Sequence, residues 1–403
     1  MSVDARLSRR GLLAASASAL LGGCSGSTSN PLASFTGTTQ PLTTATVSPP
    51  GAAIKIGMLL PLSAPGNAAK LAQDLKQAGE LALFEMNRSD IQLLAKDTQG
   101  TPDGARAAAS AAATEGAELI VGPLFAPEVR SVAAVASPAG IPVVAFSSDR
   151  TVAASGVYLL SFMPGDDVRR AVSYATTRGL APLAALIPAT AYGDIVDMTL
   201  RETASAAGTK TAVIERFALD AGGMVGPVQR LKAEIESSAR SAKAIRAVLI
   251  SGGQETMPTL APMLGHYQIG AQSGIQLIGT SSWDYPTVTE EPALQGAWFA
   301  APDPTGWSNF STRYAKTFGA SPARIASLAY DAVSLAIATA SGSKGQRFLP
   351  STLTRQSGFA GVDGLFRLRP DGTVERNYAI LGIGPGRIGV VDPAPSGFGV
   401  AGY

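Results

Sequence analysis

The sequence has very little of the two residue types on which many catalytic and metal sites depend. Its 403 residues include one cysteine, Cys24, and one histidine, His266. A disulfide within the chain and a Cys/His metal site are therefore excluded. A Ser-His-Asp triad would have to use His266, which we expect to be an ordinary polar residue on a helix surface. We expect no metal, no cofactor and no enzymatic activity.

Charge is also scarce, and the two signs are balanced. Charged residues make up 15% of the chain, with 32 Lys and Arg against 30 Asp and Glu. The small basic excess comes from residues 1–23, which hold three arginines and a single aspartate. The sequence thus gives no sign of a nucleic-acid partner. A hydrophobic content of 46% is typical of a globular chain with an ample core.

The first 23 residues have the pattern of a secretory signal peptide. A basic start precedes the apolar run Leu12–Leu21, and Ser8–Leu13 resembles a twin-arginine export signal. Leu21-Gly22-Gly23-Cys24 resembles the bacterial lipobox, whose cysteine is lipidated. Several acyl chains anchor a protein stably, and Ser25 is typical of sorting to the outer membrane. The alternative is a buried or chance cysteine, although the cysteine falls where the leader ends.

Residues 24–53 form a second segment, which begins with the lipidation candidate Cys24. This segment is rich in Ser, Thr, Pro and Gly and almost uncharged. Such a composition cannot bury enough apolar surface to fold. We expect a flexible tether with a reach of roughly 30 Å.

From Ile54 onward, short apolar runs alternate with amphipathic helical patterns. Leu119–Val121 is too short for a helix and predicts a buried strand. Apolar residues at helical spacing follow from Val129 to Ala136, and Val143–Phe146 predicts the next strand. Strand, helix and strand form a right-handed parallel βαβ unit. Repeated along the chain, this pattern predicts an α/β protein with two lobes, each a doubly wound, mainly parallel sheet flanked by helices.

The order of the predicted elements suggests where the chain passes between the lobes. We expect residues 54–160 in lobe 1, 161–300 in lobe 2, 301–355 returning to lobe 1 as two helices, 356–383 returning to lobe 2, and 384–403 as a loose Pro/Gly-rich tail. Within the last return, Gly364–Leu368 and Tyr378–Ile383 predict a closing hairpin.

This organisation resembles the type I periplasmic-binding fold of the leucine/isoleucine/valine-binding family. The most specific similarities are Gly57–Ser63, Asp97–Gly100, Ile120–Leu124, Tyr192-Gly193, Tyr330–Val333 and Gly361–Arg376. One branch is more similar than the others: the penicillin-binding protein activators, LpoA-like outer-membrane lipoproteins that stimulate class A peptidoglycan synthases. Leu59-Leu60-Pro61-Leu62-Ser63 and Val362-Asp363-Gly364-Leu365-Phe366-Arg367 carry that resemblance.

One position departs from the amino-acid-binding branch. In that branch, an acidic residue at the end of a second-lobe strand holds the ligand ammonium group. Here the strand Leu277–Gly279 is followed by the neutral residues Thr280, Ser281 and Ser282. Burying an ammonium group without an anion costs several kcal/mol. The sequence therefore predicts a groove without a buried anion and a poor site for an amino acid.

Candidate site residues follow the predicted strand ends, where ligands meet such sheets. The cleft candidates are Ser63, Phe125, Ser147, Ser148, Tyr192, Ser281 and Ser282. Tyr192 could instead face the core, and Ser147 and Ser148 could cap a turn. Trp283 and Tyr285 are candidate interface anchors, with a lid over the core as the alternative.

Two functions remain open at this point. The first is a lipid-anchored, non-enzymatic regulator that docks on a penicillin-binding protein. The second is an exported receptor that hands a small polar or amino-acid-like solute to an ABC permease. Both place the protein at a periplasm-facing membrane, with the outer membrane expected from the resemblance.

Overall fold

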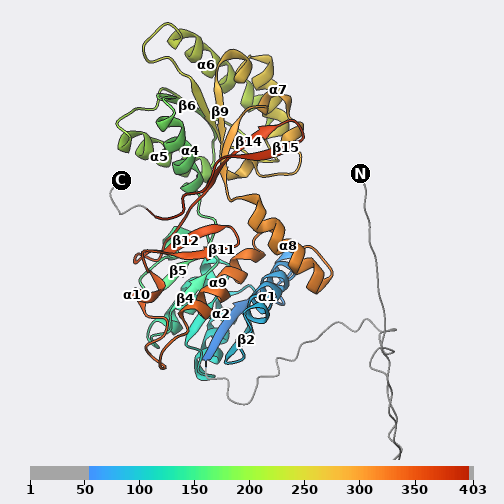
Figure 1. Ribbon diagram of the computed structural model, residues 1–403, viewed down its shortest axis with the longest axis vertical. Coiled ribbons are helices and arrows are strands. Elements are labelled where there is room, and N and C mark those ends of the chain that lie inside the picture. The colour runs from blue at the N-terminus through green and yellow to red at the C-terminus, as the bar shows by residue number, and fades with distance from the viewer. Residues whose placement is uncertain (1–53, 399–403) are drawn as a thin grey trace, which may run out of the picture. The chain divides into compact units, whose positions relative to one another are not determined.

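The computed structural model describes residues 54–398 (Figure 1). Cys24, the leader and the tether lie outside these residues. Lobe 1 begins with a five-stranded parallel sheet in the order β2-β1-β3-β4-β5. Its elements are β1 (Ile54–Leu60), α1 (Asn67–Glu85), β2 (Ile91–Asp97), α2 (Pro102–Thr114), β3 (Leu119–Val121), α3 (Ala126–Ala136), β4 (Val143–Ala145), the 3-10 turn η1 (Arg150–Val152) and β5 (Val157–Leu159).

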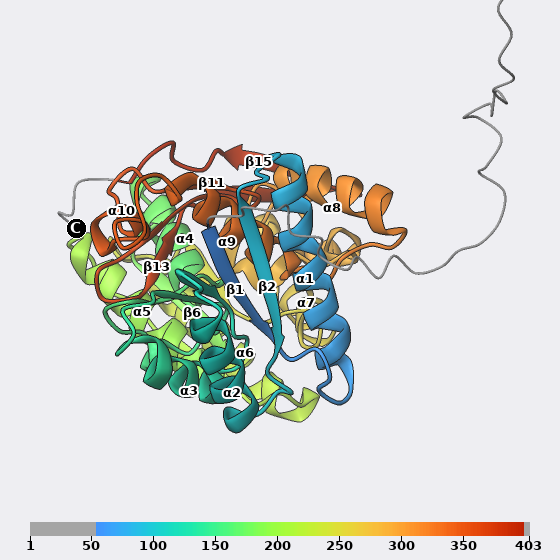
Figure 2. The same cartoon turned by 90° about the horizontal axis from the view of Figure 1, so that it is seen from below.

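Helices cover both faces of this sheet, as a doubly wound fold requires. Figure 2 shows β1 and β2 with α1 on one side and α2 and α3 on the other. The N-terminus of α2 is capped as its sequence predicts, because Thr101 accepts a hydrogen bond from the Gly104 N–H and Pro102 opens the helix. Buried Glu128 of α3 accepts hydrogen bonds from Thr98 Oγ1 at 2.5 Å and the Phe125 N–H at 3.1 Å. These bonds fix the start of α3 to the end of β2.

Lobe 2 contains a seven-stranded sheet in the order β15-β14-β10-β9-β8-β6-β7. The strands from β7 to β10 are parallel, whereas β14 and β15 run antiparallel at one edge. The elements up to β10 are α4 (Asp166–Thr177), β6 (Leu183–Pro188), α5 (Ala191–Ala206), β7 (Ile214–Phe217), α6 (Ala221–Ser238), β8 (Ala247–Ile250), α7 (Met257–His266), η2 (Ala271–Ser273), β9 (Gln276–Gly279), η3 (Ser281–Trp283), η4 (Val288–Glu290), η5 (Pro292–Leu294) and β10 (Trp298–Ala301). The predicted α/β fold with mainly parallel sheets is confirmed. His266 is the exposed last residue of α7.

The chain then returns to lobe 1. The returning elements are α8 (Pro304–Phe318), α9 (Ala326–Thr339), α10 (Pro350–Leu353), β11 (Phe359–Gly361), β12 (Gly364–Leu368) and β13 (Val374–Arg376). Helix α9 packs along α1, and Phe310 and Tyr314 of α8 belong to the lobe 1 core. The last elements, β14 (Ala379–Gly384) and β15 (Arg387–Asp392), belong to the lobe 2 sheet. None of the helices in residues 54–398 combines the length and the apolar character that a membrane span requires.

The predicted closing hairpin is wrong. Strand β12 pairs with β11 and β13, whereas β14 pairs with β10 and β15. The turn at Asp371-Gly372, with Gly372 at φ 86°, reverses the chain so early that Val374–Arg376 already pairs with β12. Phe366 and Val374 therefore lie in the core of lobe 1, and only the segment from β14 onward returns to lobe 2.

The expected loose tail also needs correction. Residues 387–392 form the edge strand β15, which pairs with β14. Pro385 and Gly386 make the tight two-residue connection, with Gly386 at φ 65°. Pro385 and Gly386, which contributed to the prediction of a loose tail, form the turn of a hairpin.

A buried charge cluster joins the returning segments to lobe 1. The Arg376 side chain is fully buried between the rings of Phe162 and Phe366, each 5.2 Å from its guanidinium carbon. Asp331 of α9 lies 3.7 Å from Arg376 and accepts a hydrogen bond from the Val362 N–H at 2.7 Å. Removing one partner of a buried pair leaves an uncompensated charge. The cluster therefore ties α9, the turn between β11 and β12, and β13 into one unit.

Asp363 extends this cluster toward the surface of lobe 1. Its carboxylate is fully buried and accepts hydrogen bonds from Arg324 and Ser327, both at 2.6 Å. Arg324 and Ser327 flank the start of α9. The Val362–Arg367 motif thus contributes buried charge to the lobe, besides apolar packing.

The Asp331→Asn variant tests the protonation of the cluster. Burial raises the pKa of Asp331 to about 7, and Arg376 opposes that rise. Asp331 therefore stays protonated up to about pH 7 in the folded chain, whereas in the unfolded chain it loses its proton near pH 4. Between pH 5 and pH 8 the free energy of unfolding should fall for wild type relative to the variant, by about 2–3 kcal/mol.

Chemical denaturation across that pH range measures this difference. The exposed Asp103→Asn variant is the matched control and should keep the pH dependence of wild type. Parallel pH profiles for wild type and Asp331→Asn would contradict the assignment.

Candidate functional site between the lobes

A cavity of about 330 Å³ lies where segments of both lobes meet. Asp167 and Tyr192 lie at helix starts, and Ser281, Ser282 and Pro302 follow strand ends, as expected for ligand sites of open α/β sheets. Arg324 comes from the segment between α8 and α9. The complete lining is Phe162, Met163, Pro164, Asp167, Tyr192, Ser281, Ser282, Asp284, Pro302, Arg324 and Tyr378.

Three of the seven predicted cleft residues line this cavity: Tyr192, Ser281 and Ser282. The four from lobe 1 do not. Ser63 is exposed and donates its N–H to Asp97, and Phe125 is 39% exposed at the start of α3. Ser147 is buried and accepts the Asp149 N–H, which is the turn-capping alternative, and Ser148 is exposed.

The hydroxyl groups at the lobe 2 strand ends form a chain of hydrogen bonds. Tyr192 donates to Thr280 Oγ1 at 3.1 Å, and Thr280 Oγ1 lies 2.7 Å from Ser282 Oγ. Ser282 Oγ donates to the Gly252 carbonyl at 3.0 Å, so Thr280 is the donor to Ser282. Burial, and secondarily the nearby Asp167, raises the pKa of Tyr192. These groups are neutral and already satisfied within the protein.

The groove does contain acidic groups, so the prediction of a groove without a buried anion is wrong. Asp167 of α4 is buried and accepts hydrogen bonds from the Ser281 N–H at 2.9 Å and the Ser281 hydroxyl at 2.7 Å. Asp284 follows η3 and also lines the cavity; its side chain is exposed at the surface, the surrounding protein atoms raise its pKa by desolvation, and Arg324 opposes the rise. The sequence signal was available, because Asp284 stands two residues after Ser282.

The cation at the cavity is Arg324. Its guanidinium carbon lies 4.6 Å from the centre of the Trp307 ring and 5.0 Å from that of Phe162. One of its amino groups donates to Asp363, whereas Nη1 is buried without a hydrogen-bond partner among residues 54–398. Arg324 therefore links the cavity to the buried cluster of lobe 1.

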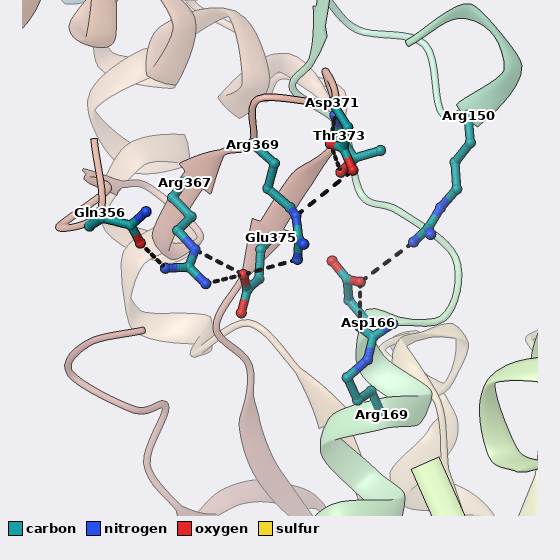
Figure 3. Close-up of polar contacts among 9 residues, drawn as sticks. All are labelled: Arg150, Asp166, Arg169, Gln356, Arg367, Arg369, Asp371, Thr373 and Glu375. Atoms are coloured by element: carbon teal, nitrogen blue, oxygen red, sulfur yellow. Dashed lines mark hydrogen bonds and ion pairs between the residues drawn. The ribbon is translucent and has the colours of Figure 1, made fainter. Parts of the chain in front are cut away.

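An ion pair beside the cavity joins the two lobes. Arg150 of η1 lies 3.7 Å from Asp166, the first residue of α4, and Asp166 also accepts a hydrogen bond from Arg169 at 2.9 Å (Figure 3). Burial raises the pKa of Asp166, and the two arginines oppose the rise. Arg150 belongs to lobe 1 and the other two residues to lobe 2, so this pair, whose arginine is half-exposed, opposes their separation modestly.

Figure 3 also shows a second polar group, on the β12–β13 sheet of lobe 1. Arg367 donates to Glu375 at 2.9 Å and to Gln356 at 2.9 Å, and Arg369 lies 3.7 Å from Glu375. Cross-strand pairs of opposite charge stabilise a sheet modestly. Here these pairs hold the Arg367 side chain in place for its contact with the Phe398 ring.

Residues 393–398, here named the C-terminal strap, run from the lobe 2 edge strand to lobe 1. At the start, Arg170 of α4 pairs with Asp392 and donates to the Tyr378 carbonyl at 2.9 Å. In the middle, Asn377 donates to the carbonyls of Pro395 and Gly397 at 2.9 and 3.0 Å. At the end, the Arg367 guanidinium lies 4.6 Å from the Phe398 ring centre. The strap thus adds a crossing between the lobes.

Trp283 and Tyr285 are not interface anchors in this structure. Trp283 is 0% exposed and Tyr285 is 6% exposed, and both belong to the lobe 2 core. Trp283 packs so closely on Gly279 that a Cβ atom there would lie 2.2 Å from the indole ring. The alternative, a lid over the core, describes both residues.

The comparisons with known proteins agree with this architecture. Residues 53–387 match the periplasmic binding protein family. This chain belongs to the periplasmic binding protein family. No curated protein matches the sequence. Solved structures of other proteins share the fold of this one.

Two kinds of structural neighbour of this periplasmic binding protein stand out. A putative branched-chain amino acid ABC transporter protein from Rhodospirillum rubrum has a TM-score of 0.73 at 20% identity, covering 84% of this chain and 100% of the other. The C-domain of LpoA from Haemophilus influenzae, a regulator of PBP1A, has a TM-score of 0.64 at 17% identity, covering 84% and 99%. Full-length LpoA from Haemophilus influenzae has a TM-score of 0.65 at 18% identity, covering 85% of this chain and 59% of the other. At these identities the likeness shows the fold.

The Trp283→Ala variant tests the structural role of this residue. Because the indole fills the space over β9, its removal should lower the free energy of unfolding by about 3–5 kcal/mol. Phe84→Ala is the control, since Phe84 is 79% exposed and its loss should change that free energy by less than about 0.5 kcal/mol. Urea denaturation measures both. If Trp283→Ala lowered the free energy of unfolding as little as Phe84→Ala does, Trp283 would not be a core residue and would again be a candidate interface anchor.

Proposed function

We propose that this periplasmic binding protein is a non-enzymatic regulator, lipid-anchored at Cys24, that docks on a class A penicillin-binding protein and activates it. The observation that carries the proposal is the set of ties between the lobes: the Arg150–Asp166 pair and the C-terminal strap. A solute receptor works by hinge closure of its lobes. A docking protein instead needs a fixed surface, which such ties provide.

The state of the cleft supports the same proposal. The hydroxyls of Tyr192 and Ser282, and both donors of Ser281, are bonded to protein groups. A ligand would have to replace these bonds, which reduces its net gain. The resemblance of Leu59–Ser63 and Val362–Arg367 to activators, and the shared fold with the LpoA C-domain, add support.

The residues available for chemistry support a non-enzymatic role. Ser281 and Ser282 line the cavity without a histidine among its lining residues. Residues 54–398 contain no group of three His, Cys, Asp or Glu that could hold a metal ion. Asp167 accepts the Ser281 hydroxyl at 2.7 Å, but its second donor, the Ser281 N–H, also holds it, and the lining offers no histidine or lysine of the kind that usually activates a serine. We therefore assign the cleft no reaction.

Reconstitution with a synthase tests the proposal. The mature lipidated protein, added to a class A penicillin-binding protein in detergent, should raise its glycosyltransferase or transpeptidase rate severalfold. Pull-down of the lipidated protein from membranes of its own cells should recover that synthase. Recovery of an ABC permease without a synthase, together with unchanged synthase rates, would overturn the proposal.

The second candidate function is a receptor that delivers a small polar or amino-acid-like solute to an ABC permease. Asp284 and Arg324 favour it, because these opposite charges line the same cavity of about 330 Å³. A receptor should gain thermal stability from its solute by mass action, by about 2.7 kcal/mol at a hundredfold excess over Kd. An amino-acid panel in differential scanning fluorimetry separates the two functions, since a regulator should show no shift at this cavity.

The strap makes a separate prediction. The double variant Asn377→Ala/Phe398→Ala removes the middle and end contacts of the strap while leaving both cores intact. Amide hydrogen exchange at the crossing 376–379 should then rise by about tenfold, the effect of ~1.4 kcal/mol. Activation of the synthase should fall with it. Unchanged exchange at this crossing would show that the strap does not restrain the lobes. The control is Met198→Ala, because Met198 is 52% exposed on α5 and its removal should leave the exchange at this crossing unchanged.

A further inference from the structure

Two large apolar side chains are exposed where α1 ends. Phe84, in the last turn of the helix, is 79% exposed, and Met86, the residue that follows the helix, is 39% exposed. Residues 84–87 are all exposed and together cover a full helical turn. The end of α1 therefore projects into solvent with apolar groups on it. Exposed apolar surface of this kind is typical of sites that contact a membrane or another protein.

The tether joins lobe 1 beside this helix end. The N–H of Ile54, the first residue of β1, donates to the Asp90 carbonyl at 3.2 Å, and Asp90 directly precedes β2. The chain from Met86 to Asp90 spans at most about 15 Å even when it is fully extended. Residues 25–53 separate Ile54 from the lipidation candidate Cys24. The end of α1 thus lies next to the segment that would hold the lobe near a membrane.

The charged groups around the helix end are paired within the protein. Glu85 accepts a hydrogen bond from Arg313 at 2.9 Å, and Arg88 donates two hydrogen bonds to Asp90, both at 2.7 Å. The two pairs leave no net charge among these four residues. Attraction to anionic lipid headgroups requires an excess of basic residues. A contact with a membrane at this place must therefore come from the apolar side chains.

The turn that follows α1 is held by the rest of lobe 1. Asn87 has the left-handed φ of 49° and donates its N–H to the Phe84 carbonyl at 3.1 Å, which ends the helix. Arg88 also donates to the Ile337 carbonyl of α9 at 3.3 Å. A segment that is already fixed loses little conformational entropy when it makes a contact. The exposed side chains are therefore presented on a preformed surface.

We propose that Phe84 and Met86 insert into the lipid leaflet that holds the acyl chains of Cys24, so that lobe 1 contacts the membrane through the end of α1. The inference rests on the lipid anchor of the proposed function. Aromatic and other apolar side chains enter the boundary between headgroups and acyl chains. The tether raises the effective concentration of the membrane surface, so that a contact made by two side chains is sufficient. The contact would give the anchored protein one orientation toward the membrane.

Coupling through Cys24 tests this contact without relying on lipidation in cells. Cys24 is the only cysteine of the chain, so it attaches residues 24–403 to a maleimide lipid in phosphatidylcholine vesicles. Lipids brominated on their acyl chains should quench the added indole of the Met86→Trp variant, measured against wild type. The quenching should be the same at low and high salt, because the contact is apolar. The control is Met198→Trp on α5, where the added indole should not be quenched.

The Phe84→Ser change, made in the Met86→Trp chain, measures what the phenyl ring contributes. It should lower the equilibrium constant for docking by about tenfold or more. Leu219→Ser is the matched control, because Leu219 is 56% exposed in lobe 2, and it should leave the quenching unchanged. Both substitutions are at exposed positions, so the fold should be retained.

Four results would overturn the proposal. Three concern the vesicles: no quenching in Met86→Trp, equal quenching in Met86→Trp and Met198→Trp, or unchanged quenching after Phe84→Ser. The fourth is a dimer in sedimentation velocity that Phe84→Ser abolishes, which would assign this surface to a second copy of the chain. No synthase takes part in these measurements, so a failed contact would leave the proposed function standing.

Discussion

The buried arginine Arg376 is the constraint on which the arrangement of the lobes depends. It lies where β13 ends and the chain crosses to β14, and its guanidinium is enclosed by Phe162, Phe366 and Asp331. Phe162 belongs to the first crossing between the lobes, and Asp331 to the helix that returns to lobe 1. A charge buried without its partners is strongly destabilising. These three segments must therefore assemble together. The first crossing, at Phe162, and the last crossing, after Arg376, are held by the same buried contact.

The contacts beside the cleft extend from this anchor. Arg324 donates to Asp363 of the same cluster and lies over Phe162 and Trp307, so the one cation of the cavity lining is held from the lobe 1 side. Asp167 is held from the lobe 2 side by Ser281. Arg324 and Asp167 thus each belong to the structure of their own lobe. A ligand or substitution that moves the Arg324 side chain would therefore also disturb its hydrogen bond to Asp363 in the buried cluster.

The sequence predicted the fold where local patterns decide it. Strand β3 has the bounds that its apolar run predicts, Leu119–Val121, and the predicted strands Val143–Phe146 and Leu277–Gly279 each differ from the observed strand by one residue. Parallel strands buried on both faces leave a continuous apolar signal. The prediction failed at the closing hairpin, where Gly364–Leu368 had two possible partners downstream. Pairing there is decided by the turn at Gly372 and by which core receives Phe366, and neither is a local property.

The candidate site was predictable only in part for the same reason. Strand-end position identified Tyr192, Ser281 and Ser282, since the carboxyl ends of parallel strands meet at one edge. Asp167 and Arg324 come from a helix start and an interhelix segment, which only the crossings bring to that edge. Neutral residues after a strand do not make a neutral groove, because a groove between two lobes is also built by the segments that cross between them. The ligand class of such a cleft therefore has to be inferred from the crossings as much as from the strand ends.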